Sequence, residues 1–143
     1  MNSFLRISEA AALALHTMGL LATDPERVFA NKELAAGFQA SEAHLAKVMQ
    51  RLTKAGLVHS RRGPKGGFSL ATDPERTSLL EVYEAAEGPM EISHCLFGQP
   101  VCRNGCIMGG FLEGISRQVI EYLKKTKLSE ISPILKNQIR KDT

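Results

Sequence analysis

At 143 residues the chain has the length of one domain, and its content of 43% hydrophobic and 23% charged residues is ordinary for a globular protein. The three cysteines are an odd, clustered number, which argues against a secreted disulfide framework. The one long apolar run, residues 10–22, is too short to span a bilayer. We therefore expect a cytoplasmic protein that has no membrane partner.

The first predicted helix runs from Ser8 to Ala22. Ser8 is suited to the N-cap and Glu9 to the first turn. Because the helix is apolar on nearly all sides, we expect it to be buried on more than one of them. His16 has the chemistry of a metal ligand, but on so apolar a helix the better interpretation is a hydrogen-bonded core histidine.

A short helix is predicted over residues 31–37, with Asn31 as its cap, and residues 37–40 form the turn that follows. Phe38 in this turn is expected to fill the space between two helices. The pair of helices separated by a short turn indicates a helix-turn-helix.

The second helix of this pair is predicted from Ser41 to Ala55, with Ser41 as its N-cap. Its apolar residues recur at positions i, i+3, i+4 and i+7, on one face: Leu45, Val48, Met49 and Leu52. Gly56 ends the helix. Two short strands, residues 57–62 and 68–70, then flank a glycine-rich turn. A helix-turn-helix followed by a hairpin is a winged helix-turn-helix.

The charge distribution supports a polyanion partner. Between Ala43 and Thr72 there is no carboxylate, whereas there are six cations: Lys47, Arg51, Lys54, Arg61, Arg62 and Lys65. The whole chain carries a net charge of only +3, so residues outside this stretch are net acidic. A solvated helix normally mixes charges of both signs, because opposite charges four residues apart stabilise it. The stretch therefore predicts binding to double-stranded DNA rather than a merely basic surface.

The hairpin contains one specific motif, Arg62-Gly63-Pro64-x-Gly66-Gly67-Phe68-x-Leu70. Further positions of the same pattern are Leu34-Ala35, Ser41, Leu45, Leu52 and Ala55-Gly56-Leu57-Val58. Together they resemble the signature of the IscR/NsrR/CymR-type regulators, the Rrf2 family of bacterial winged-helix repressors and activators. The resemblance covers nearly the whole chain. It implies a sequence-specific transcriptional regulator, expected to be a repressor, and not an enzyme.

In such a fold the second helix enters the major groove and the wing reaches the adjacent minor groove. The predicted DNA-binding residues are Ser41, His44, Lys47, Arg51, Arg61, Arg62 and Lys65. Of these, Ser41, His44 and Lys47 are expected to face the groove, and Arg51 is expected to contact a phosphate. The resemblance implies that Arg62 reads the minor groove.

A further helix is predicted over residues 77–87, ended by Gly88-Pro89. Residues 73–116 around it hold seven carboxylates and only two arginines. Such a region repels phosphate, so we expect it to carry regulation rather than DNA contacts.

All three cysteines lie in this acidic region, with the spacing Cys95-x6-Cys102-x3-Cys106. The turn-rich loop could bring the three sulfurs together, and thiolates suit iron–sulfur clusters or zinc, which usually take four donors. The resemblance implies a cluster of the 2Fe–2S or 4Fe–4S type. The family's usual fourth ligands have no match here, because residues 108–110 are Met-Gly-Gly and the aligned helix-one position is Ala12; His94 and Glu9 are the nearest substitutes. Three interpretations stay open: cluster binding, a thiol or disulfide switch without metal, and inert cysteines.

A long helix is predicted over residues 110–126. Its broad apolar stripe consists of Phe111, Leu112, Ile115, Val119, Ile120, Tyr122 and Leu123. A small domain has little surface left to cover such a stripe, so we expect an isologous homodimer rather than packing only within one chain. Its palindromic operator would have half-sites about 34 Å apart. The last helix is predicted over residues 128–141, with Pro133 in its first turn.

The predicted fold class is mainly α with a small β-hairpin wing. Residues 1–76 form the winged helix-turn-helix, and residues 77–143 form the cysteine loop and dimerisation helices, packed with the first helix into one unit. The alternative is a winged-helix regulator or a protein-interaction module that has no cofactor and is controlled by thiol oxidation or a partner protein. Steeply salt-dependent retention on duplex DNA distinguishes the two functions.

Overall fold

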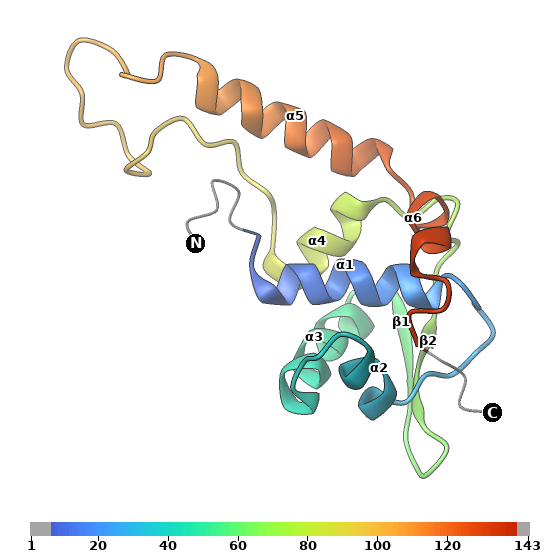
Figure 1. Ribbon diagram of the computed structural model, residues 1–143. Helices are drawn as coiled ribbons and strands as arrows, with labels where there is room; N and C mark the ends of the chain where they lie inside the picture. The colour runs from blue at the N-terminus through green and yellow to red at the C-terminus, as the bar shows by residue number, and fades with distance from the viewer. Residues whose placement is uncertain (1–6, 140–143) are drawn as a thin grey trace.

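The computed structural model describes residues 7–139 and confirms the predicted fold class (Figure 1). In chain order the elements are α1 (Glu9–Leu21), α2 (Asn31–Gly37), α3 (Glu42–Lys54), β1 (Val58–Arg61), β2 (Gly67–Leu70), α4 (Leu79–Glu87), α5 (Phe111–Lys125) and α6 (Leu128–Leu135). The two strands form one antiparallel hairpin. Within residues 7–139 no helix is both long and apolar enough to cross a membrane.

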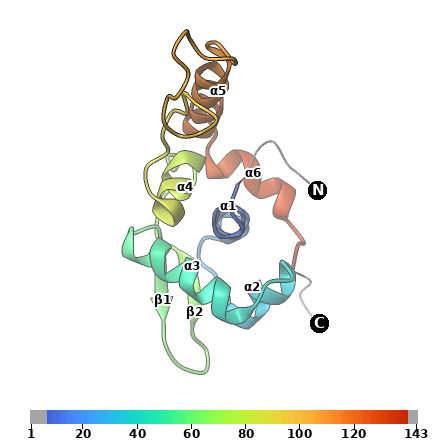
Figure 2. The ribbon, with the colours of Figure 1, turned by 90° about the vertical axis from the view of Figure 1, so that its left-hand side faces the viewer.

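Helix α1 lies in the middle of the molecule, with α2, α3, α4 and α6 around it (Figure 2). Ser8 caps it as predicted, since its hydroxyl accepts a hydrogen bond from the Ala11 N–H at 3.0 Å. The burial of α1 on several sides explains its nearly continuous apolar character. His16 is the exception, and its assignment to the core is wrong. The ring is exposed, and its Nδ1 lies 2.6 Å from the carbonyl oxygen of Ala12, one turn earlier in the same helix.

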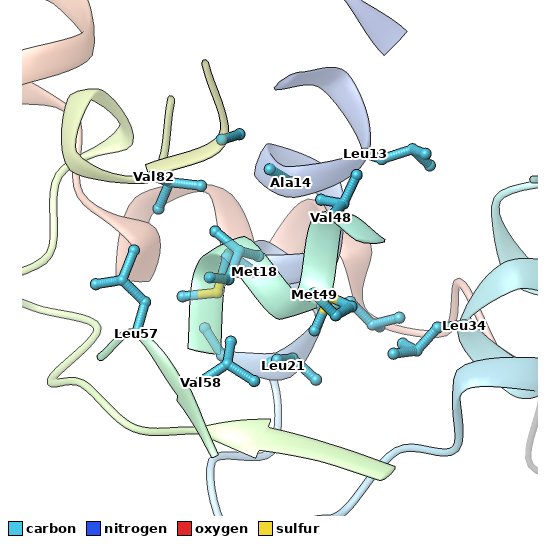
Figure 3. Packing of buried hydrophobic residues seen from close by; sticks show 14 of the residues in the cluster. Leu13, Ala14, Met18, Leu21, Leu34, Val48, Met49, Leu57, Val58 and Val82 are labelled. Carbon is cyan, nitrogen blue, oxygen red and sulfur yellow. The ribbon is translucent and has the colours of Figure 1, made fainter. Parts of the chain in front are cut away.

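The core forms where α1 meets α3, α4 and the hairpin. Figure 3 shows Met18 of α1, Val48 and Met49 of α3, Val58 of β1 and Val82 of α4 gathered there, and all five are buried. The whole predicted apolar face of α3 is buried: Leu45, Val48, Met49 and Leu52. Each fully buried side chain of this size contributes about 1.5–3 kcal/mol. This face therefore fixes which side of α3 turns outward.

The beginning of α2 differs from the prediction. Ala30, not Asn31, occupies the N-cap position, and its N–H donates to Oε2 of Glu33 at 3.3 Å. The Asn31 amide instead donates from Nδ2 to the carbonyl oxygen of Glu42 at 2.9 Å. This bond joins the start of α2 to the start of α3. Phe38, in the turn between them, is half-buried and meets the His16 ring edge-on, with ring centroids 5.8 Å apart.

Helix α3 ends as predicted at Gly56, which takes a φ of +79°. The N–H groups of Gly56 and Leu57 donate to the carbonyls of Thr53 and Leu52, both at 3.0 Å. This is the Schellman pattern, which satisfies carbonyls left open at the end of a helix. The chain then turns directly into β1.

The hairpin has a third backbone segment that the sequence did not reveal. Phe29 pairs with Phe68 of β2 through two hydrogen bonds, N–H to O in both directions, each 2.8 Å long. Gly67, the first residue of β2, has a φ of +151°, and a Cβ placed there would lie 2.1 Å from the Phe29 carbonyl oxygen. The glycine is therefore required by the close approach of this third segment.

The last helices pack back onto the body. Ser78 caps α4 and forms a capping box with Glu81, since the Ser78 N–H donates to Glu81 Oε2 at 2.7 Å and the Glu81 N–H donates to the Ser78 hydroxyl at 3.2 Å. The Leu79 N–H donates to the Thr126 carbonyl at 2.9 Å, which ties the start of α4 to the segment between α5 and α6.

Helix α6 is shorter than predicted, and Pro133 lies in its second turn rather than its first. A proline there has no N–H for the helix and disfavours its continuation. The helix ends at Leu135, and Asn137 follows with a φ of +72°. The Gln138 amide then donates to the Gly37 carbonyl at 2.9 Å, which returns the chain to α2. Residues 140 and 141 of the predicted helix lie outside the described residues.

Candidate nucleic-acid interface and cysteine loop

The outward face of α3 is polar and basic. Lys47, Gln50 and Lys54 are exposed and recur three and four residues apart, opposite the buried face. Ser41 begins the helix, and its hydroxyl accepts a hydrogen bond from the His44 N–H at 3.0 Å. The cap therefore holds the first turn of α3 in place while Ser41 itself stays exposed.

The wing lies beside this face. Its cationic side chains Arg61, Arg62 and Lys65 are all exposed. A groove of about 390 Å³ separates α3 from the hairpin, and its lining residues are Ala46, Gln50, Thr53, Lys54, Ser60, Arg62 and Phe68. The fold thus brings a cation of the helix, Lys54, and a cation of the wing, Arg62, to one concave surface. The predicted DNA-binding set omitted Gln50 and Lys54, which the helical period opposite the buried face would have found.

Two residues of the predicted set lie on a different flank of α3. Nδ1 of His44 is 3.8 Å from Oε2 of Glu9, at the start of α1. Nη1 of Arg51 donates to the carbonyl oxygen of Ala86, in the last turn of α4, at 2.8 Å. These side chains contact neighbouring helices, whereas Lys47 and Lys54 point away from the body.

The outward cations have no carboxylate partners. Within residues 7–139, none of the side chains of Lys47, Lys54, Arg61, Arg62 and Lys65 forms an ion pair. A group of exposed cations without counter-charges produces a positive potential over α3 and the wing. This surface can therefore attract a polyanion.

The cysteine loop, residues 88–110, lies at the opposite end of the molecule from the wing, beyond the start of α5 (Figure 1). All three cysteines are free thiols, and Cys95 is half-buried whereas Cys102 and Cys106 are exposed. Two sulfurs accept hydrogen bonds from the backbone two residues later. Phe97 N–H donates to Cys95 Sγ and Met108 N–H donates to Cys106 Sγ, both at 3.4 Å. Cys95 Sγ in turn donates to the carbonyl oxygen of Gln99 at 3.3 Å.

The loop does not assemble a metal site in this conformation. The part of the chain that the structure describes contains no group of three or more histidine, cysteine, aspartate or glutamate side chains that could hold a metal ion. The expected convergence of the three sulfurs is therefore not observed. Met90, at the start of the loop, packs against the core, whereas Leu96, Phe97 and Val101 farther along are exposed. Thiolates suit an iron–sulfur cluster chemically, but their placement here does not fit one.

His94, the proposed substitute for the fourth ligand, contacts α5 rather than the cysteines. Its Nδ1 lies 3.4 Å from Oε2 of Glu113, in the first turn of α5. The hydrogen bond and the positive charge of Arg117, with a smaller effect of His94, lower the pKa of the Glu113 carboxyl below its usual value. Glu113 is thus a carboxylate near neutral pH, and it holds His94 at the base of the loop.

Apolar side chains remain uncovered on the loop and on α5. Helix α5 buries only Leu112 and Leu123. The large exposed residues of this region are Leu96, Phe97, Val101, Ile107, Phe111 and Tyr122. The apolar stripe of α5 is therefore broader than its own chain covers.

Comparison with known proteins agrees with this geometry. Residues 7–133 match the family model Rrf2, described as an iron-dependent transcriptional regulator. The regulator IscR of Cereibacter sphaeroides is 29% identical over 134 residues, which are 91% of this chain and 84% of that protein. NsrR of Bacillus licheniformis is 28% identical over 138 residues, 94% of each chain.

A solved structure shows the same fold. The structure of CymR, the global cysteine regulator of B. subtilis, is similar with a TM-score of 0.73 and 28% identity, covering 92% of this chain and 98% of that one. The family model spans nearly the whole chain, and both named relatives are transcriptional regulators. The protein therefore belongs to the Rrf2 family of DNA-binding transcriptional regulators, and it is a regulator rather than an enzyme.

Proposed function

We propose that the protein is a homodimeric repressor that acts in the cytoplasm, binds a palindromic operator and responds to redox conditions through its cysteine loop. The observation that carries the proposal is the unpaired basic surface formed by the outward face of α3 and the wing. Residues 1–76 would supply this surface, and residues 77–143 the regulation and the dimer contacts.

In this proposal α3 enters the major groove. Ser41 and Lys47 lie along its exposed side, and Gln50 can donate to and accept from an adenine edge. Lys54 lies toward the end of the helix and Arg62 on the wing, on either side of one groove, where they can contact phosphates and the neighbouring minor groove. Arg61 and Lys65 extend the same charge along the hairpin.

The salt dependence of binding to duplex DNA tests this function. Each phosphate neutralised adds about −0.9 to the slope of log K against log salt concentration. Besides Arg51, which contacts α4, the stretch has five exposed cations, and these give an expected slope of about −4 to −5 for each subunit. Fluorescence anisotropy with an operator selected from a random duplex pool measures it. A salt-independent interaction with another protein, and no retention on DNA, would favour the protein-binding alternative.

The uncovered stripe of α5 supports the homodimer. Ile115 and Tyr122 lie two turns apart on this stripe, and 63% of Tyr122 is exposed. Replacing both residues by glutamate places charges where two α5 helices would meet, so light scattering is expected to report a monomer. Lys124→Glu, on the other side of the same helix, is the matched control and should remain dimeric. A double variant that is still a dimer would assign the interface to another surface.

The three free thiols supply the proposed redox response. Oxidation of two thiols to a disulfide releases two protons and two electrons, which a peroxide takes up when its O–O bond breaks to give water. A new crosslink would change the shape of the loop and hence the spacing of two recognition helices in a dimer.

Replacing Cys95, Cys102 and Cys106 together by serine is expected to make operator affinity the same under oxidising and reducing conditions, because the loop then contains no thiol that could form a disulfide. The wild-type chain should change its affinity between the two conditions. A triple variant that keeps the wild-type response would contradict the assignment. Iron and acid-labile sulfide counted on an anaerobically purified sample decide separately whether a cluster, rather than the thiols alone, occupies the loop.

A further inference from the structure

Arg51 makes a contact that a role in binding phosphate does not explain. Its guanidinium donates from Nη1 to the carbonyl oxygen of Ala86 at 2.8 Å. Arg51 lies near the end of α3, and Ala86 is the penultimate residue of α4. The bond therefore joins the recognition helix to the last turn of the helix that leads into the cysteine loop.

The electrostatics of α4 favour a cation at this place. The carbonyls at the end of a helix have no partners within the helix, and this end carries the negative pole of the helix dipole. The last turn of α4 contains no basic residue of its own. Arg51 supplies the positive charge from α3, through a hydrogen bond that the charge of the donor strengthens.

The end of α4 also contacts a third helix, α1. The Glu87 carboxylate accepts a hydrogen bond from the hydroxyl of Ser8, which caps α1. Glu9, the next residue, lies 3.8 Å from His44 at the start of α3. Gly88 follows α4 with a φ of +88° and begins the cysteine loop. A movement of the loop that shifts Gly88 therefore acts directly on the contacts that join α1, α3 and α4.

We propose that Arg51 is a positioning residue: it fixes α3 relative to the end of α4 and passes a change in the cysteine loop to the recognition helix. This inference rests on the proposed function, since it concerns operator binding and its redox response. It replaces the sequence-based assignment of Arg51 to a DNA phosphate with a contact inside the protein.

The test compares Arg51→Ala with Lys54→Ala, which removes the same charge from the outward face of the same helix. Operator affinity is measured against salt concentration, under reducing and oxidising conditions, together with the melting temperature of the free protein. For Arg51→Ala we expect weaker binding, an unchanged salt slope, loss of the wild-type difference between the two redox conditions, and a lower melting temperature. For Lys54→Ala we expect the slope to flatten by about 0.9 for each subunit, with the redox difference and the melting temperature retained.

The opposite pattern overturns the proposal. If Arg51→Ala flattens the slope as Lys54→Ala does and melts like the wild type, Arg51 contacts a phosphate. If Arg51→Ala keeps the redox difference, or if the wild type shows none, the contact transmits nothing from the loop. Should Arg51→Ala fail to fold, Arg51→Gln keeps the first part of the side chain but lacks the charge and the guanidinium that contacts Ala86, so the salt slope decides in the same way. If the wild type binds no duplex DNA, the proposed function fails, and the melting temperatures alone decide whether Arg51 joins α3 to α4.

Discussion

Replacing Lys47, Lys54 and Arg62 together by alanine is expected to lower the affinity for the operator at least about 100-fold at about 0.15 M salt. Each lost phosphate contact removes roughly 0.7 log unit of affinity at this salt concentration, and each subunit loses three. The three side chains are exposed, and two of them, Lys54 and Arg62, line the same groove between α3 and the wing. Anisotropy titrations over a range of salt concentrations measure both the loss and the flatter slope.

A matched control removes the same charge elsewhere. Lys124, Lys125 and Lys136 are exposed at the end of α5 and after α6, away from the groove between α3 and the wing. Their joint replacement by alanine lowers the net charge equally, so a long-range effect of net charge would weaken binding in both variants. We expect the control to bind within a few-fold of the wild type. Equal losses in the two variants would show that the basic surface of α3 and the wing is not the interface.

Local signals made the recognition helix predictable. The buried face of α3 follows from the helical period, and the caps Ser8 and Ser41 bond to N–H groups only three residues away. The prediction of Asn31 as the N-cap of α2 was wrong because its side chain forms a contact with a residue far along the chain. The Asn31 side chain donates to the carbonyl of Glu42, eleven residues later, and is not available as a cap. The N–H of Ala30 donates instead to the carboxylate of Glu33. Sequence pattern alone does not indicate which of these contacts forms.

The candidate site was predictable in charge but not in detail. The run of cations without carboxylates identified the surface, because the charge of a segment can be counted from the sequence without knowing how the chain folds. The contacts of Arg51 with Ala86 and of His44 with Glu9 depend on how α4 and α1 pack against α3, and no spacing in the chain encodes them. The cysteine spacing likewise showed which donors are present, but not whether the loop brings them together.

Gly67→Ala is expected to lower the free energy of unfolding by about 3–5 kcal/mol, a large part of the stability of an ordinary domain. The φ of +151° at this residue disfavours a side chain, and a new Cβ would lie 2.1 Å from the oxygen and 2.6 Å from the carbon of the Phe29 carbonyl. The backbone strain costs about 1–3 kcal/mol. Moving Phe29 away would also break its two hydrogen bonds with Phe68, each worth about 1 kcal/mol. Urea unfolding of the free protein measures the change.

Gly63→Ala separates the clash from the backbone conformation. Gly63 lies in the same wing and has a φ of +103°, but a Cβ there would have no atom within 4 Å. Only the conformational strain of about 1–3 kcal/mol should remain, without the clash and the lost hydrogen bonds, so Gly67→Ala should be the less stable of the two variants. If the two variants are equally stable, the segment around Phe29 can move away from the new Cβ with little loss of free energy. The wing would then be held by β1 and β2 alone, and the second glycine of the Gly66-Gly67 pair would serve the turn rather than the third segment.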